Sequence, residues 1–214
     1  GDELFGGYNR YTWGNKFLRT ISLMPKQMRQ VTASAFSVIP PTYWDSLLGP
    51  IFAVTPEKYR HTNLGEKIHK LASLMSVSGV DELYRASVSN WEHPESIVRF
   101  ATEPNIIGNL FNEELSGLSF VERMMYFDAC VYLPEDILVK VDRSAMSVSL
   151  ETRVPFLDHR VVDLAWRMPL NLKIRDGIGK WCLRELLYRR VPKEMIERPK
   201  MGFAVPIGDW LKGP

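Results

Sequence analysis

The sequence of 214 residues has little cysteine, no long apolar run and no excess of charge of one sign. Its two cysteines, Cys130 and Cys182, lie far apart within apolar helical patterns, so a disulfide framework is not expected. No apolar stretch approaches the roughly 20 residues needed to cross a bilayer, and no N-terminal signal pattern is present. We therefore expect a cytoplasmic protein without a membrane partner.

The charge balance also argues against nucleic acid as a partner. Lysine and arginine number 27 and aspartate and glutamate 25, which leaves a net charge of +2. The basic residues are scattered, and Arg189-Arg190 is the only tight basic pair in a helical context, so no stripe follows a phosphate backbone. A hydrophobic fraction of 45% is typical of a globular protein of one domain, or of one domain with a small satellite.

Strand-like alternation, internal repeats and low-complexity segments are scarce or absent, whereas helical periodicity runs through most of the chain. Residues 92–117 are polar and broken by proline and glycine, so we interpret them as loop, and only short segments such as 172–174 could be strands. We predict a mostly α fold. Helices are predicted within residues 8–23, 25–38, 43–48, 64–75, 81–88, 120–133, 135–148, 158–166, 180–190, 192–199 and 209–212.

Several helix ends carry recognisable signals. Ser119 followed by Glu122 is a capping-box pattern, and the helix after it is apolar on nearly all sides, so it should be central and buried. Pro134 is expected to break this helix, because proline lacks the backbone donor that a helix interior needs. Gly49 and Pro50 are expected to close the short helix before them.

Residues 1–8, with the sequence GDELFGGY, form the first candidate site. Asp2 and Glu3 stand before Gly6 and Gly7, and such a glycine pair allows the backbone to approach a ligand closely. Carboxylates at this turn suit a hard cation such as Mg²⁺, which prefers oxygen ligands and bridges phosphates. From composition alone, an acidic helix cap with a glycine hinge is the favoured interpretation.

Residues 133–146 form the second candidate site. Asp136, Lys140 and Arg143 lie at spacings of four and three residues, and therefore on one face of a helix. A face of mixed charge could bind a charged amino-acid substrate, but a set of solvated ion pairs explains the spacing more simply. Further along the chain, Arg153 lies between two acids, and we interpret it as half of a structural ion pair.

Residues 198–206 form the third candidate site. Pro199 and Gly202 keep this segment out of a regular helix, so Lys200 projects from irregular backbone. A lysine in that position could stabilise negative charge on a transferring phosphoryl or adenylyl group. An ordinary surface lysine is an equally good explanation of the pattern.

Four segments together resemble the C-terminal domain of the asparagine synthetase family. They are DELFGGY at residues 2–8, LPEDILVKVDR at 133–143, ETRVPFLD at 151–158 and RPKMGF at 198–203. They occur in the order of the family and span nearly the whole chain, so the resemblance is specific. It implies that residues 1–214 are the helical C-terminal part of an α/β synthetase domain of the ATP pyrophosphatase type, similar to adenine-nucleotide hydrolases.

The resemblance also implies an activity. Such a domain uses ATP and Mg²⁺ to convert the side-chain carboxylate of aspartate into an adenylate, which ammonia attacks to give asparagine. It implies that Asp2 binds Mg²⁺, that Lys200 stabilises the developing charge, and that Asp136 is a catalytic or substrate-side acid. Three residues are implied to shape the nucleotide loop: Gly6, Gly7 and Tyr8.

The sequence departs from the family in what it lacks. The pyrophosphate loop Ser-Gly-Gly-x-Asp-Ser and the N-terminal cysteine that attacks glutamine are absent from the 214 residues. The chain also starts without methionine, directly in the acidic motif. We interpret it as a fragment, inactive by itself, whose partner is the N-terminal glutaminase domain of the same protein.

Three alternatives stay open. The amide acceptor could be a carboxylate on a sugar, a peptide or an antibiotic precursor, and ring closure as in β-lactam formation is a further variant. From another class, the chain could be a non-catalytic helical interaction module. A homodimer is left open for the assembly.

Overall fold

The computed structural model describes residues 1–53, 64–89, 91, 94–100, 102, 104, 115–197 and 206–213. These residues are mostly helical and contain no strand, only an isolated antiparallel bridge between Arg175 and Ile178. The predicted mostly α fold is confirmed, and the α/β architecture expected of the wider domain stays a prediction. No helix in the described part of the chain is long and apolar enough to cross a membrane.

The described elements follow one another along the chain in a simple order. They are α1 (Asp2–Phe5), α2 (Asn9–Ser22), α3 (Lys26–Val38), α4 (Pro41–Ala53), α5 (Leu64–Met75), α6 (Val80–Val88), η2 (Pro94–Ser96), α8 (Phe120–Phe127), η4 (Asp128–Leu138), α9 (Val139–Met146), η5 (Pro155–Leu157), α10 (His159–Arg167), α11 (Leu170–Lys173), α12 (Trp181–Tyr188), α13 (Lys193–Ile196) and α14 (Ile207–Leu211). The segments η2 and η5 are single 3₁₀ turns, and η4 is π-helical.

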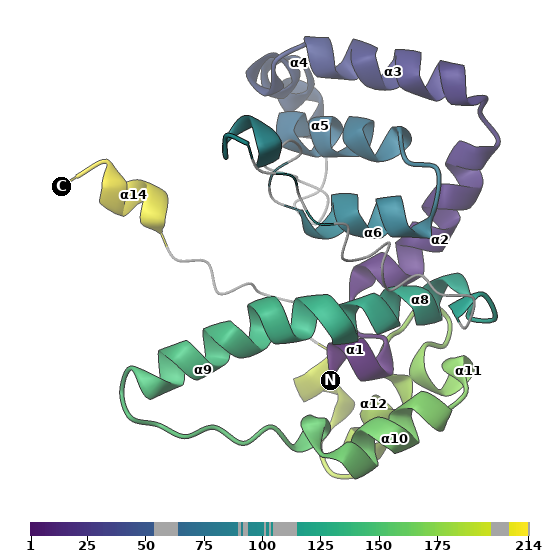
Figure 1. Cartoon of the computed structure of the whole chain (residues 1–214), viewed down its shortest axis with the longest axis vertical. Coiled ribbons are helices and arrows are strands. Elements are labelled where there is room, and N and C mark those ends of the chain that lie inside the picture. Colours follow the sequence, from purple (N-terminus) through teal and green to yellow (C-terminus); the bar gives the residue numbers. More distant parts are fainter. Residues whose placement is uncertain are drawn as a thin grey trace.

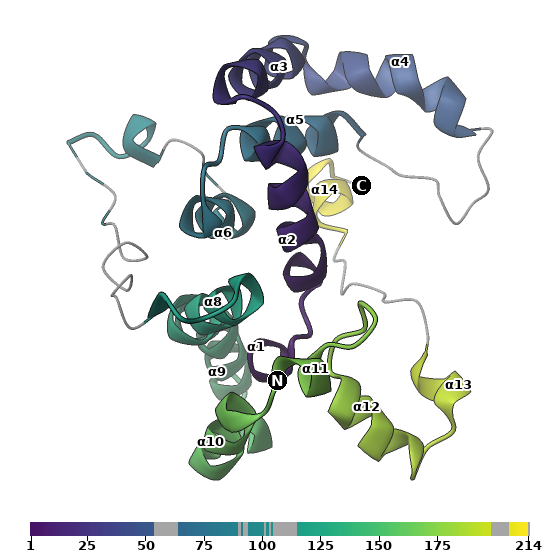
Figure 2. The ribbon, with the colours of Figure 1, turned by 90° about the vertical axis from the view of Figure 1, so that its right-hand side faces the viewer.

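Two groups of helices lie one above the other (Figure 1). We call α3, α4 and α5 the upper layer, and α1 together with α8 to α12 and η4 the lower layer. Helix α2 descends from the upper layer to the lower one, and α6 lies between them (Figure 2). Helices α3 and α4 both pack on α5, whereas α2 and α6 both pack on α8. Helix α8 is therefore the element on which the two linking helices meet.

Local sequence signals explain where several helices begin. The Ser119 capping box is confirmed, because the backbone N–H of Ser119 donates to Glu122 Oε2 at 2.8 Å and Ser119 Oγ accepts from the Glu122 backbone. Asp158 caps α10 by accepting from the backbone N–H of Arg160 at 2.9 Å. Pro25 directly precedes α3, as expected for a residue that has no N–H to satisfy.

The prediction that Pro134 breaks the central helix is wrong. Helices α8 and α9 are joined without interruption by η4, and Pro134 lies inside that π-helical segment. Hydrogen bonds from residue i to i+5 widen the turn, which relieves the clash between the proline ring and the preceding carbonyl groups. The free-energy cost of Pro134 is therefore limited to the hydrogen bond that proline cannot donate. Helices α8 and α9 and the segment η4 form one long helix along the lower layer (Figure 1).

Two other boundaries differ from the prediction. Helix α4 runs on through Gly49 and Pro50 instead of closing there, and no atom of the described residues crowds Gly49. Residues 172–174, a candidate strand, lie instead in and just after the short helix α11, which starts after Pro169. The effect of Pro50 on the helix was therefore misjudged, and the short apolar segment 172–174 was assigned to the wrong kind of element.

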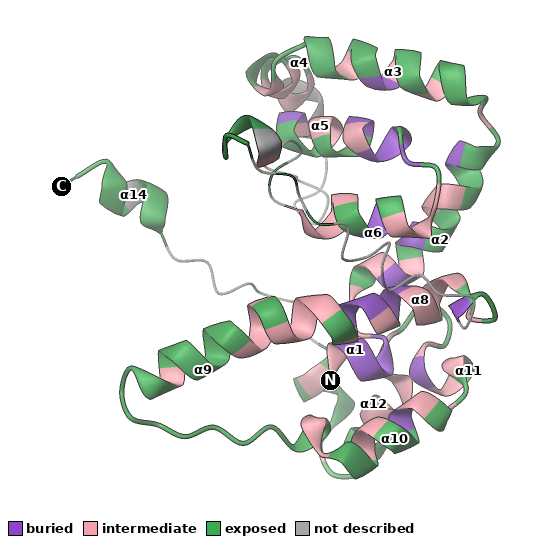
Figure 3. Ribbon diagram, viewed as in Figure 1, coloured by how far each residue is buried: buried purple, intermediate pink, exposed green. Residues whose placement is uncertain are grey.

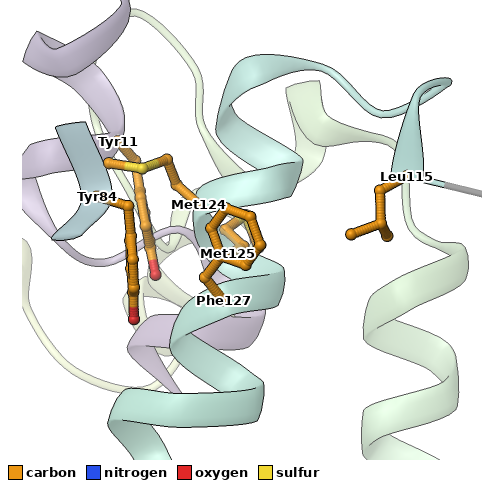
Figure 4. Close-up of a cluster of buried hydrophobic side chains, with 6 residues drawn as sticks. All are labelled: Tyr11, Tyr84, Leu115, Met124, Met125 and Phe127. Carbon is orange, nitrogen blue, oxygen red and sulfur yellow. The ribbon is translucent and has the colours of Figure 1, made fainter. Parts of the chain in front are cut away.

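Buried residues concentrate where the two linking helices meet α8 (Figure 3). The side chains of Tyr11, Tyr84, Met124 and Phe127 pack together there, with almost no exposed surface (Figure 4). The first half of the helix after Ser119 is therefore central and buried as predicted, whereas Cys130 in its second half is exposed. A separate small cluster around Leu4 joins α1 to α10, so the acidic N-terminal turn is anchored on the core of the lower layer.

Candidate functional site

The acidic loop, residues 1–8, is a single helical turn closed by two glycines. Gly6 has a φ of 70° in the left-handed region, and the backbone N–H of Gly7 donates to the carbonyl of Asp2 at 2.8 Å. A Cβ atom on Gly6 would lie 2.4 Å from Ile174 Cγ1, and one on Gly7 would lie 2.1 Å from Asp2 Oδ1. The turn therefore requires glycine at both positions, and it brings the Asp2 carboxylate close to the backbone.

A lysine from the far end of the chain lies against this loop. Lys180 Nζ donates to Asp2 Oδ2 at 2.8 Å, and the backbone N–H of Lys180 donates to the carbonyl of Phe5 at 2.8 Å. A Cβ atom on Gly179 would lie 2.0 Å from the carbonyl oxygen of Gly6, so the turn before α12 packs backbone to backbone on the loop. The structure thus joins an acid and an ammonium group 178 residues apart.

The second acid of the loop has a different role. Glu3 is only 2% exposed, and its Oε1 accepts a hydrogen bond of 2.7 Å from the Tyr8 hydroxyl. Burial and the neighbouring Glu3 carboxylate raise the pKa of Tyr8 far above its ordinary value, so its hydroxyl stays a donor. Glu3 and Tyr8 therefore fix the shape of the loop, and Asp2 is the carboxylate of the pair that faces outward.

The donor set of the loop fits Mg²⁺ shared with a phosphate, but not a protein cage for a metal. The described residues contain no group of three or more histidine, cysteine, aspartate or glutamate side chains placed to hold an ion. Asp2 is 32% exposed and offers one carboxylate, and Mg²⁺ typically keeps several waters and takes one or two carboxylates with substrate phosphates. Asp2 would hold the ion, and that role stays a prediction. The ammonium group of Lys180, which the sequence did not single out, would lie beside the phosphate.

A buried carboxylate organises the region next to the loop. Asp128 is completely buried at the start of η4, and it accepts hydrogen bonds from Arg10 Nε at 3.1 Å, from Arg10 Nη2, from the Tyr84 hydroxyl at 2.9 Å and from the Tyr11 hydroxyl. Burial raises the pKa of Asp128, whereas the Arg10 and tyrosine donors oppose the rise. Burial and the Asp128 charge also raise the pKa values of Tyr11 and Tyr84, which keeps both hydroxyls as donors.

A cavity of about 570 Å³ opens beside this buried carboxylate. Asp136 and Lys140 lie on one face of the helix, as the spacing predicted, and Lys140 Nζ donates to Asp136 Oδ2 at 2.8 Å. The cavity wall comes from α2, α6 and the long helix. Its residues are Arg10, Tyr84, Ser87, Val88, Val131, Tyr132, Glu135, Asp136 and Lys140. Asp136 therefore lines a cavity, although its catalytic role stays a prediction.

Aromatic packing connects the acidic loop to this cavity. The rings of Tyr8 and Tyr132 meet edge to face, with centroids 5.8 Å apart. The Arg10 guanidinium lies 4.1 Å from the Tyr8 ring centroid and 5.0 Å from that of Tyr132. No hydrogen bond within the described residues joins Asp136 to the Asp2–Lys180 pair. The acidic loop and the cavity are thus adjacent, because Tyr8 of the loop packs against Tyr132, which lines the cavity.

The remaining predicted residues fall into two groups. Lys200 and its segment lie outside the described residues, so its proposed role stays a prediction. Arg153 pairs with Glu151, which confirms the predicted structural ion pair, but Asp158 pairs with Arg160 instead. These pairs are exposed on the surface.

Sequence reasoning missed Lys180, Arg10 and Asp128. The sequence did contain a signal for Asp128. An acidic residue inside the most apolar predicted helix must accept hydrogen bonds from donors elsewhere in the protein. No pattern in the sequence indicated that a lysine after Gly179 would reach Asp2, since the contact depends on how two distant turns pack.

Comparison with known proteins identifies relatives of the chain. The asparagine synthase family matches residues 1–214. Asparagine synthetase (glutamine-hydrolyzing) 1 of Bacillus subtilis is 34% identical over 218 aligned residues, which cover 99% of this chain and 30% of the relative. A putative asparagine synthetase (glutamine-hydrolyzing) of Mycobacterium tuberculosis is 33% identical, covering 99% of the chain and 29% of the relative. The human asparagine synthetase (glutamine-hydrolyzing) is 39% identical over 82 residues, or 35% of the chain.

No solved structure matches the chain. The chain spans about 30% of the length of the curated bacterial relatives that match all of it. The family match covers every residue, and the acidic loop with its glycines lies at the start of the matched region. The chain belongs to the asparagine synthase family.

Proposed function

We propose that the full protein carrying this chain is a glutamine-hydrolysing asparagine synthetase. The side-chain carboxylate of aspartate attacks the α-phosphorus of ATP, and pyrophosphate leaves. Ammonia released from glutamine then attacks the acyl carbon of the adenylate, AMP leaves, and an amide remains. Two bacterial relatives with this name match 99% of the chain at 34% and 33% identity, which supports the proposal.

The observation that carries the proposal is the Asp2–Lys180 pair on the glycine-closed loop. The two groups come from opposite ends of the chain, yet Nζ and Oδ2 lie 2.8 Å apart and both side chains are about one-third exposed. A carboxylate and an ammonium group held together at an open surface suit a ligand that brings both a cation and phosphate oxygens. Magnesium, when bound with ATP, supplies positive charge to the leaving pyrophosphate.

The residues of the chain have distinct parts in this proposal. Gly6 and Gly7 shape the loop so that the side chains of Asp2 and Lys180 can pack against its backbone, and Tyr8 holds the loop through Glu3. Lys180 leaves Asp2 for the phosphate when ligand enters, which costs little because the pair is partly solvated. Lys200 is proposed to stabilise the developing charge, and Asp136 is proposed to be a substrate-side acid in the adjoining cavity.

The test uses the full-length protein with ammonia as nitrogen donor, because ammonia bypasses glutamine hydrolysis. Loss of one preorganised cation typically lowers kcat by about 10²–10³. We expect losses of this size in Lys180→Ala and in Lys200→Ala, measured as pyrophosphate release from ATP and aspartate. Asp2→Asn should weaken the dependence of the rate on Mg²⁺, since the amide keeps the size but removes the charge.

Lys16→Ala is the matched control, since Lys16 is exposed on α2 away from the loop. It should retain the wild-type rate. Near wild-type turnover in Lys180→Ala, together with an unchanged Mg²⁺ profile in Asp2→Asn, would contradict the proposal.

A further inference from the structure

The cavity beside η4 is lined by Arg10, whose guanidinium group is held in one orientation by Asp128. The carboxylate of Asp128, which is completely buried, accepts hydrogen bonds from Nε and Nη2 of Arg10. These two nitrogens form one edge of the guanidinium group. Nη1 makes no hydrogen bond to any residue in the described part of the chain, and Arg10 is one of the residues that line the cavity. One pair of N–H donors is therefore left for a ligand.

The plane of this guanidinium is also constrained. The Tyr8 and Tyr132 rings lie 4.1 Å and 5.0 Å from the Arg10 carbon Cζ, and the Arg10 side chain keeps only 15% of its surface exposed. Because the side chain is already held, little rotamer entropy is lost when a ligand binds. A planar guanidinium presented in this way suits a carboxylate better than a flexible ammonium would.

Negative charge, opposite to that of Arg10, is present in the same cavity. Glu135 and Asp136 both line it, and Lys140 is engaged with Asp136 at 2.8 Å. Glu135 is exposed and forms no ion pair with the residues that the structure describes. A purely anionic ligand would meet repulsion from these acids. A ligand with a carboxylate for Arg10 and an ammonium group for Glu135 matches both signs, as the head group of an amino acid does.

We propose that Arg10 is a specificity-determining residue that binds the non-reacting carboxylate of the acceptor, and that Glu135 binds the ammonium group of the same molecule. The assignment rests on the proposed amide-forming function. The reacting carboxylate belongs at the acidic loop, where Asp2 and Lys180 lie, so the head group is held apart from the reacting end. Asp128 is a positioning residue, because it touches Arg10 and not the ligand.

The experiment compares three acceptors in the full-length protein with ammonia as donor. L-Aspartate is the reference, its α-amide lacks the carboxylate assigned to Arg10, and succinate lacks the ammonium group assigned to Glu135. Wild type should favour aspartate over the α-amide in kcat/KM by about 10- to 100-fold, the worth of a hydrogen-bonded charge. Arg10→Met should abolish that preference, and Arg10→Lys should restore part of it, with the KM for ATP unchanged in both.

Two of the variants, Arg10→Lys and Glu135→Gln, make the test independent of any damage to folding. Arg10→Lys preserves the charge opposite Asp128, and Glu135→Gln alters an exposed side chain, so both should fold. Glu135→Gln should reduce only the preference for aspartate over succinate. Arg19→Met, on the exposed face of the same helix as Arg10, should keep every preference.

Calorimetric binding of aspartate separates the two proposals. If wild type forms amide and Arg10→Met keeps the preference for aspartate, the Arg10 assignment is wrong and the function stands. If wild type binds aspartate without turnover and Arg10→Met loses that binding, the assignment stands and the proposed function falls. An absence of both binding and turnover in wild type would overturn both.

Discussion

The two layers of the molecule hold their helices together in different ways. In the upper layer, α3 and α5 meet through small or flexible apolar residues such as Ala33, Ala72 and Met75, while Val31 and Val38 remain 69% and 79% exposed. The lower layer and the linking helices contain Glu3, Asp128 and Lys173, the three buried charged residues of the described chain. Apolar side chains pack in both regions, whereas the buried charges of the described residues all lie in the second.

This difference bears on function. A charge kept away from water costs free energy unless donors or counterions surround it, so packing alone does not account for its presence. Buried charged and polar groups with shifted pKa values are typical of functional sites. Here they surround the acidic loop and the adjacent cavity. The proposed chemistry is therefore assigned to the lower layer and its junction with α2 and α6.

Removal of the central charge should give the largest effect. Asp128→Asn leaves the partly buried Arg10 without its counterion, and breaking a buried pair from one side typically costs about 3–5 kcal/mol. We expect a loss of that size in the free energy of unfolding, measured by urea denaturation. Asp163→Ala removes only an exposed ion pair with Arg167 and should cost less than about 1 kcal/mol. Asp163 lies on α10 of the same layer, so equal effects of the two variants would show that the burial of Asp128 carries no special weight.

Alkaline pH should weaken the lower layer next. The pKa values of Tyr11 and Tyr84 are raised above the ordinary value of 10.0, so the fold favours their neutral forms. The resulting stability is complete below pH 10 and is lost as the pH rises, by about 1.4 kcal/mol for each tyrosine and pH unit. Ultraviolet titration should show that Tyr11 and Tyr84 ionise only as the protein unfolds. Ionisation of both hydroxyls in the folded protein, before the unfolding transition, would contradict the buried network.

Two glycines allow a matched test of the layers. A Cβ atom on Gly179 would lie 2.0 Å from the Gly6 carbonyl oxygen in the lower layer, and one on Gly65 would lie 2.0 Å from the Pro41 carbonyl oxygen in the upper layer. Alanine at either position should cost about 1–3 kcal/mol of stability. Only Gly179→Ala should also weaken the Mg²⁺-dependent rate of the full-length protein. A similar loss of rate in Gly65→Ala would show that the upper layer takes part in the site.

The smallest expected effect is local. Ser119→Ala removes one cap of α8 and should cost about 1 kcal/mol. Because hydrogen bonds from Ser119 lower the pKa of Glu122 below 4.5, their contribution is present above pH 4.5 and fades as Glu122 is protonated. The cost of Ser119→Ala should therefore shrink in acid, as measured by denaturation at several pH values. Ser22→Ala, which loses only a bond to the Arg19 carbonyl, should show no such trend.

Local chemistry made part of this architecture predictable. The caps at Ser119 and Asp158 depend on residues three positions apart or fewer, so the sequence contains the whole interaction. Proline was harder to interpret. The effect of Pro134 depends on whether the backbone can widen into a π-helix, and that choice is made by the packing of the long helix on its neighbours.

The site was predictable only in pieces. The glycine turn at residues 6–7 follows from composition, and the Asp136–Lys140 pair follows from helical spacing. The contacts of Arg10 with Asp128 and of Lys180 with Asp2 join residues 118 and 178 positions apart, and no periodicity encodes such distances. Long-range polar contacts are settled by tertiary packing, which is why the central residues of the site emerged only from the structure.

The contact between Lys180 and Asp2 has a consequence for how the protein is made. Proteins emerge from the ribosome from the N-terminus onward, and contacts of high sequence separation form late in folding. A nascent chain that ends before Lys180 exposes the acidic loop without its ammonium partner and without the turn at Gly179 that packs on it. Translation therefore supplies the second half of this ion pair only after most of the chain has been synthesised, and premature termination before α12 would yield helices without a completed loop.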